Sequence, residues 1–105
     1  MKKILAMVLA LIMVSVCFVA CGDKGDEKVL KIGVFEPASG PNGAGGKQES
    51  LGIKYANSVC PTVDIDGVTY KVELVEVDNQ SADDKAVTAA SELVNKGVSV
   101  VVGSY

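Results

Sequence analysis

The sequence predicts an α/β fold in which a βαβαβ unit forms a parallel open sheet. Three apolar segments rich in β-branched residues (29–35, 68–77 and 98–102) alternate with two segments of helical periodicity. A stretch rich in glycine and proline follows the first segment, as expected of a loop that leads from a strand into a helix. Strands that alternate with helices pair in parallel through right-handed crossovers, so we expect the helices to pack on the sheet.

The first 20 residues have the order of features found in a secretory signal peptide. Lys2 and Lys3 precede an apolar run from Ile4 to Ala20, and a polar, glycine-containing segment follows it. The alternative is an uncleaved membrane anchor. The 17 residues of the run fall short of the roughly 20 that cross a bilayer. We therefore expect cleavage and export.

Cys21 is the expected site of lipidation. A small residue, Ala20, precedes it, which resembles the end of a bacterial lipobox, whereas Cys17 follows the larger Val16. A diacylated cysteine would provide the two-chain anchoring that a single chain does not give. Residues 21–28 then form a charged tether, and the protein is expected to be a membrane-anchored lipoprotein facing the outside of the cell.

The first half of the remaining chain predicts a strand, a loop and a helix. Residues 29–35 are expected to be a strand buried on both faces. The loop at 36–46 contains four glycines and two prolines, and a helix is expected from about Gly46 to Val59. Its apolar stripe would face the sheet, with Gly52 allowing close approach; the stripe consists of Leu51, Gly52, Tyr55, Ala56 and Val59.

The second half predicts a hairpin, a helix and a last strand. Asp66-Gly67 is a hairpin turn signal between arms at 63–65 and 68–70, and the second arm continues as a strand to Val77. Ser81 and Asp84 resemble a capping box for a helix at about 82–96, which Gly97 would end. Residues 98–102 carry no charge and suit the middle of a parallel sheet. The expected apolar stripe of this helix is Ala86, Val87, Ala90, Leu93 and Val94.

Composition and motif spacing argue against several functional classes. There is no histidine, and Cys60 stands alone once Cys17 is removed and Cys21 is lipidated, so neither a metal site nor a disulfide framework is expected. Loss of Lys2 and Lys3 lowers the net charge from −3 to −5, which argues against nucleic-acid binding. No nucleophile lies beside a base, so no catalytic residue is expected.

Nucleotide motifs also fail in the glycine-rich loop. With Gly46 and Lys47 aligned to a Walker A motif, its first glycine would fall on Pro41 and its hydroxyl residue on Gln48. The dinucleotide fingerprint fails at Gln48 as well. Asp78 stands at the end of a strand, where a ribose-binding acid could lie, but we interpret it as an ordinary residue that opens a loop.

The loops at the carboxyl edge of the sheet remain as the candidate ligand site, because open α/β sheets bind ligands there. Backbone N–H groups and hydroxyls at this edge suit the carboxylate of a small zwitterion. The alternative is a solvated loop with no function. The candidate residues are Ser39, Gly40, Pro41, Asn42, Gly43, Ala44 and Gly45 in the first loop, and Ser104 and Tyr105 in the last.

Residues 29–105 resemble the branched-chain amino acid type of periplasmic binding protein. The resemblance lies in Lys31–Gly46, in Glu49, Gly52 and Ala56 of the following helix, in Asp78-Asn79, in Lys85-Ala86-Val87 and in the closing Val100–Tyr105. It implies a two-lobed type I binding fold in which the ligand lies between the lobes. Residues 29–105 would be part of the N-terminal lobe, in a fragment that lacks the second lobe.

The resemblance further implies an importer component. The expected ligand is an amino acid or a related small amide, the expected partners are ABC permease subunits, and no cofactor is expected. Two alternatives stay open: a receptor lobe that senses its ligand, and a small nucleotide-binding enzyme. Neighbouring permease and ATPase genes would favour transport over sensing, and tight nucleotide binding would favour the enzyme.

Overall fold

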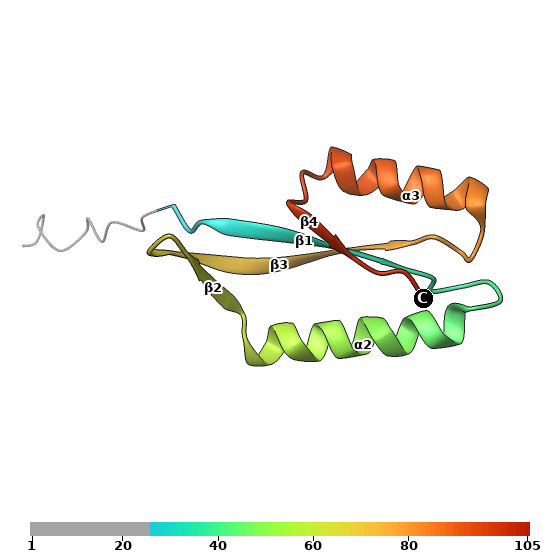
Figure 1. Ribbon diagram of the computed structural model, residues 1–105, viewed down its shortest axis with the longest axis horizontal. Helices are drawn as coiled ribbons and strands as arrows, with labels where there is room; N and C mark the ends of the chain where they lie inside the picture. Colours follow the sequence, from blue (N-terminus) through green and yellow to red (C-terminus); the bar gives the residue numbers. More distant parts are fainter. Residues whose placement is uncertain (1–25) are drawn as a thin grey trace, which may run out of the picture.

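A four-stranded sheet with one helix on each face makes up the protein in the computed structural model, which describes residues 26–105 (Figure 1). The predicted signal peptide and Cys21 lie outside the described residues. The elements in chain order are β1 (Val29–Glu36), α2 (Gly43–Val59), β2 (Thr62–Ile65), β3 (Val68–Asp78), α3 (Asp83–Asn95) and β4 (Val100–Val102). The predicted order of strands and helices is confirmed.

The sheet has the strand order β2-β3-β1-β4. β1 pairs in parallel with β3, from Val29 opposite Lys71 to Glu36 opposite Asp78, and in parallel with β4 on its other side. The predicted hairpin forms, because Asp66 and Gly67 adopt φ values of 50° and 76°, as a tight two-residue hairpin turn requires. Its first arm, β2, adds an antiparallel edge strand to the three parallel strands.

β4 does not lie where the sequence predicted. Its uncharged run suggested the middle of the sheet, but β4 is an edge strand of the described sheet, and β1 occupies the centre. Because no described strand pairs with its outer side, Val100, Val101 and Val102 are each about half exposed, at 50%, 48% and 44%. A strand without charged residues can be buried on both sides, but the absence of charge does not determine its place in the sheet.

The core has a part on each face of the sheet. The buried apolar side chains of residues 26–105 are Val34, Val75, Ala89 and Leu93. Val75 pairs with Gly33 and lies with Ala89 and Leu93 on the α3 side, whereas Val34 follows Gly33 in β1 and therefore faces the opposite side, toward α2. Leu93 is the anchor of α3, since a Cβ placed on Gly33 of β1 would lie 3.0 Å from its Cδ1. The predicted stripe of α3 is correct at Leu93 but wrong at Ala90, Val87 and Val94, which are exposed, the two valines at 70% and 75%.

The predicted stripe of α2 also faces the wrong way. Leu51, Tyr55 and Val59 are exposed, and nothing lies within 4 Å of a Cβ placed on Gly52. The buried and half-buried residues of α2 are Gly43, Gly45, Gly46, Ser50, Ile53 and Asn57, and all of them except Gly45 lie on one side of the helix. A Cβ on Gly46 would collide with the carbonyl oxygen of Pro37, so small residues let the start of α2 lie against the end of β1. The helix begins at Gly43, three residues before the predicted start at Gly46.

The sequence predicted the C-terminal end of α3 correctly and the cap at its N-terminal end wrongly. The residue that caps its N-terminus is Ala82, with no side-chain capping bond, so the predicted capping box at Ser81 is wrong. Ser81 binds the loop after β1 instead. At the other end, Gly97 has a φ of 71°, which confirms that the helix ends in a left-handed residue.

Candidate functional site

Three loops meet at the carboxyl edge of the sheet, following β1, β3 and β4. They lie together because parallel strands end on the same side, and both helices also begin there (Figure 1). A polar pocket of about 260 Å³ opens between them. Its lining residues are Phe35, Asn42, Asn79, Ser81, Ala82, Asp83, Ala86, Ser104 and Tyr105.

Asp78 anchors the loop after β1. Its Oδ1 accepts hydrogen bonds from the backbone N–H groups of Ala38 (2.7 Å), Ser39 (3.3 Å) and Gln80 (2.8 Å). Its Oδ2 accepts the hydroxyl of Ser39 at 2.7 Å. The interpretation of Asp78 as an ordinary loop-opening residue is therefore too weak, because one carboxylate joins two loops that are 40 residues apart in the chain.

These hydrogen bonds also control the charge of Asp78. The hydroxyl of Ser39 makes the largest contribution to lowering the pKa of this carboxyl, and the N–H groups of Gln80, Ala38 and Ser39 add to it against an opposing desolvation. The carboxylate is thus stabilised in its ionised form. The Ser39 hydroxyl donates to Asp78 and not into the pocket, so other groups must supply the donors that were expected of Ser39.

Asn79 and Ser81 link the second loop to the other two. Asn79 is buried, its Nδ2 donates to Ser104 Oγ at 2.9 Å, and its Oδ1 accepts from Ser81 N at 3.0 Å. Ser81 Oγ accepts from Asn42 N at 3.1 Å and donates to the Ser39 carbonyl at 3.3 Å. The loop after β3 therefore connects the two loops that the sequence singled out.

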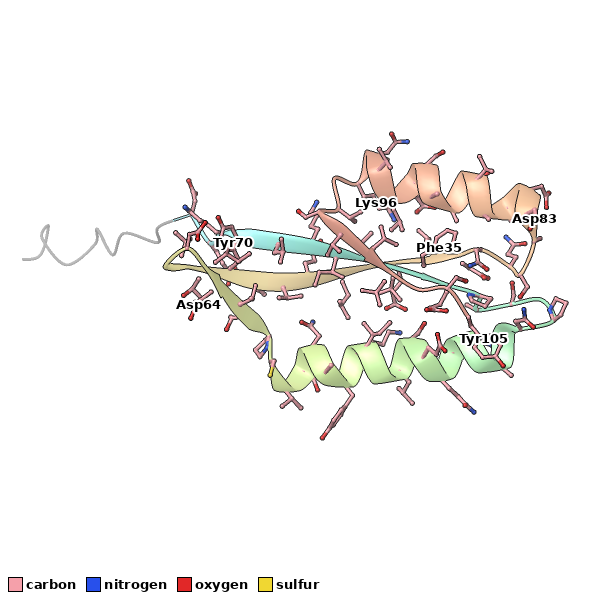
Figure 2. The ribbon with its side chains drawn as sticks, in the orientation of Figure 1. Phe35, Asp64, Tyr70, Asp83, Lys96 and Tyr105 are labelled. Carbon is pink, nitrogen blue, oxygen red and sulfur yellow. The ribbon has the colours of Figure 1, made fainter. Side chains whose placement is uncertain are left out.

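The last loop lies across the first turn of α2. Figure 2 shows Tyr105 beside the start of this helix, and a Cβ placed on Gly45 would lie 2.7 Å from Cζ of its ring. The Tyr105 N–H donates to Glu36 Oε2 at 2.8 Å. The two segments predicted to bind ligand are thus in contact.

The predicted residues divide into two groups. Asn42, Ser104 and Tyr105 line the pocket, and Gly45 supports the Tyr105 ring. The others shape the loop and the first turn of α2 without lining the pocket; they are Ser39, Gly40, Pro41, Gly43 and Ala44.

Sequence reasoning missed much of the pocket wall. The sequence predicted Ser81 only as part of a helix cap, and it did not predict Phe35, Asn79, Ala82, Asp83 or Ala86 as part of a site. The available signal for Asn79, Ser81 and Asp83 was their position shortly after the second parallel strand, at the edge where the other two loops begin.

The pocket has a distinct chemical character. Asp83 is the one charged side chain among its lining residues, and the others supply amide and hydroxyl groups or small apolar surfaces. In residues 26–105, no group of three or more His, Cys, Asp or Glu side chains is placed to hold a metal ion. The described helices include none that is both long and apolar enough to cross a membrane.

Cys60 lies in a different environment. It is exposed and lines a second pocket, of about 380 Å³, between the end of α2 and the sheet. That pocket is lined mainly by aliphatic side chains, including Ile32, Ile53 and Leu74. It lies away from the three loops and shares no lining residue with the polar pocket.

Comparison with known proteins agrees with this geometry. A family model described as periplasmic binding protein matches residues 29–105. The structure is similar to that of the leucine-binding protein LivK from Thermotoga maritima, with 33% identity, a TM-score of 0.64, and coverage of 71% of this chain and 21% of that one. No curated protein sequence matches the chain.

A second solved structure is also similar to the chain in sequence and in fold. The branched-chain amino acid transporter substrate-binding protein LivJ from Streptococcus pneumoniae, in complex with isoleucine, has 32% identity and a TM-score of 0.60. The match covers 72% of this chain and 22% of that one. The chain thus spans about a fifth of the length of these two solved structures.

Proposed function

Because the chain belongs to the periplasmic binding protein family, we propose that it binds the substrate of an importer for branched-chain amino acids or related small amides. The observation that carries this proposal is the meeting of three strand-end loops at one polar pocket. Family members and the two solved neighbours are binding proteins, and the pocket has no nucleophile paired with a base, so we assign no catalytic step.

The chemistry of the pocket suits an amino acid. The Asn42 amide offers donors for a carboxylate, and the Ser81 and Ser104 hydroxyls would do so by giving up their 3.3 Å hydrogen bonds to the Ser39 and Tyr105 carbonyls. α3 begins at the pocket with no side-chain cap on its first turn, which leaves backbone N–H groups for an anion. Asp83 could pair with the ammonium group, and Phe35 offers an apolar surface for the ligand side chain.

The proposed setting is the outside of the cell membrane. Lipidated Cys21 would hold the chain there through the 21–28 tether, and an ABC permease would take the ligand from it. The two solved neighbours are named as a leucine-binding protein and a transporter substrate-binding protein, which supports this setting. Permease and ATPase genes beside the gene for this chain would support transport.

The test is a titration of the ¹⁵N-labelled 105-residue chain in detergent with leucine, isoleucine or valine. The pocket is open, and binding sites normally enclose most of a ligand, so we expect a Kd of about 1 mM or weaker. Amide shifts are expected at 39–45, 79–84 and 104–105. Glutamate and acetamide serve as comparison ligands that separate the amino acid and amide alternatives.

A matched pair of serine variants controls this test. Ser81→Ala removes a hydroxyl that lines the pocket, while Ser91→Ala removes one that donates to the Val87 carbonyl on the exposed side of α3. Ser81→Ala is expected to weaken binding several-fold and Ser91→Ala to leave it unchanged. Shifts that appear around Cys60 instead, or no shifts at tens of millimolar ligand, would contradict the proposed site.

A further inference from the structure

We propose that Glu36 is a positioning residue for the pocket, and that its buried carboxylate holds the 103–105 loop in place so that Ser104 and Tyr105 line it. The inference rests on the proposed function, because it concerns the loop that would contact the ligand. It assigns a role to a residue that ends the central strand, does not line the pocket and forms none of the ion pairs within residues 26–105.

The Glu36 side chain is only 3% exposed. A buried carboxylate is costly unless it is hydrogen-bonded, and this one accepts the N–H of Tyr105 at 2.8 Å. A hydrogen bond to an ionised acceptor is about twice as strong as one between neutral groups. The loop therefore supplies a hydrogen-bond donor to the buried carboxylate, and Glu36 in turn fixes the backbone of the loop.

The approach of the loop to β1 is too close for any side chain at position 103. Gly103 has a φ of 126°, and a Cβ placed there would lie 2.7 Å from Glu36 Oε1 and would collide with the Phe35 carbonyl oxygen. Both carboxylate oxygens of Glu36 thus face this loop. Asn79 also holds this loop, through a hydrogen bond to the Ser104 hydroxyl, so two buried polar residues set its position.

Other ionisable groups around Glu36 are mostly acidic. Glu49 on α2 interacts with Glu36 directly. Desolvation is the largest cause that raises the pKa of Glu49, and the charge of Glu36 and a hydrogen bond to Glu36 raise it further. Asp78 is the partner of Glu36 in β3, but its carboxylate is occupied by the loop after β1. Asp83 lines the pocket at the start of α3. No lysine of residues 26–105 forms an ion pair with Glu36, so the test follows the Tyr105 N–H as the hydrogen-bond partner of this carboxylate.

The test follows the Tyr105 amide directly, in the full 105-residue chain labelled with ¹⁵N-tyrosine. The described residues hold three tyrosines, of which Tyr55 on α2 and Tyr70 on β3 serve as internal controls. Glu36→Gln keeps the shape of the side chain and removes its charge, so the Tyr105 amide proton is expected to move upfield and to exchange faster with solvent. The Tyr55 and Tyr70 amides are expected to behave as in the wild type.

Two further variants make the result specific. Glu49→Gln keeps the contact of Glu36 with Tyr105 and removes a neighbouring acid, so the Tyr105 amide is expected to keep its wild-type shift and exchange rate. Glu73→Gln, on an exposed position of β3, is also expected to change nothing. A Tyr105 amide that is the same in Glu36→Gln as in the wild type would overturn the role of Glu36.

The readout needs no ligand, so it separates this inference from the proposed function. Ligand binding at the pocket together with a Tyr105 amide that Glu36→Gln leaves unchanged would overturn the Glu36 assignment alone. A Tyr105 amide that responds to Glu36→Gln without ligand binding would support the assignment and contradict the proposed function. If Glu36→Gln fails to fold, Glu36→Asp, which shortens the side chain by one methylene, takes its place in the same comparison.

Discussion

Replacement of Leu93 by alanine is expected to detach α3 from the sheet, whereas replacement of its neighbour Val94 is not. Leu93 is 1% exposed and packs against Gly33, and it is one of the few buried apolar side chains of the described residues. Leucine-to-alanine changes at buried sites cost about 2–5 kcal/mol. Small domains have only about 5–15 kcal/mol of stability in total, so this loss would be a large share.

Val94 is the matched control because it follows Leu93 in the same helix but is 75% exposed. Val94→Ala is expected to change stability by no more than about 0.5 kcal/mol, since alanine favours the helix and little surface is lost. Both variants are compared with the wild type by urea unfolding followed by far-UV circular dichroism, and Leu93→Val provides a milder change if Leu93→Ala does not fold. Equal losses from the two alanine variants would refute the packing of α3 described above.

Two other predictions follow from the loops and the N-terminus. Asp78→Asn removes the charge that the Ser39 hydroxyl stabilises, so we expect faster hydrogen exchange at the Ala38 amide, measured against Asp64→Asn on the β2 hairpin arm. Hydrogen bonding lowers the pKa of Asp78 below its ordinary value of 3.8. The wild-type loop is therefore expected to stay anchored at neutral pH and to loosen only as the pH falls below about 4. Loosening of the loop near pH 6 would contradict this expectation. Cys21→Ser is expected to abolish incorporation of labelled palmitate and Cys17→Ser to leave it intact, and incorporation into Cys21→Ser would refute the lipobox assignment.

Local sequence signals determined the elements and their order. Alternation of β-branched segments with helical segments gives the βαβαβ order, the Asp66-Gly67 turn gives the hairpin, and Gly97 gives the end of α3. These features depend on backbone preferences over a few residues, and such preferences are present in the sequence itself. The glycine-rich loop and the last three residues were likewise placed correctly at one edge of the sheet.

Tertiary structure alone decided which helix faces are buried and how the loops are joined. In α2, close approach of Gly46 to Pro37 turned the glycine side toward the sheet and left Leu51 and Tyr55 exposed, although periodicity favoured the opposite face. Asp78 and Glu36 have ordinary sequence contexts, and their roles arise because parallel strands bring residues about 40 to 70 positions apart within hydrogen-bonding distance. Contacts between segments so far apart depend on the path of the whole chain, which no local pattern encodes.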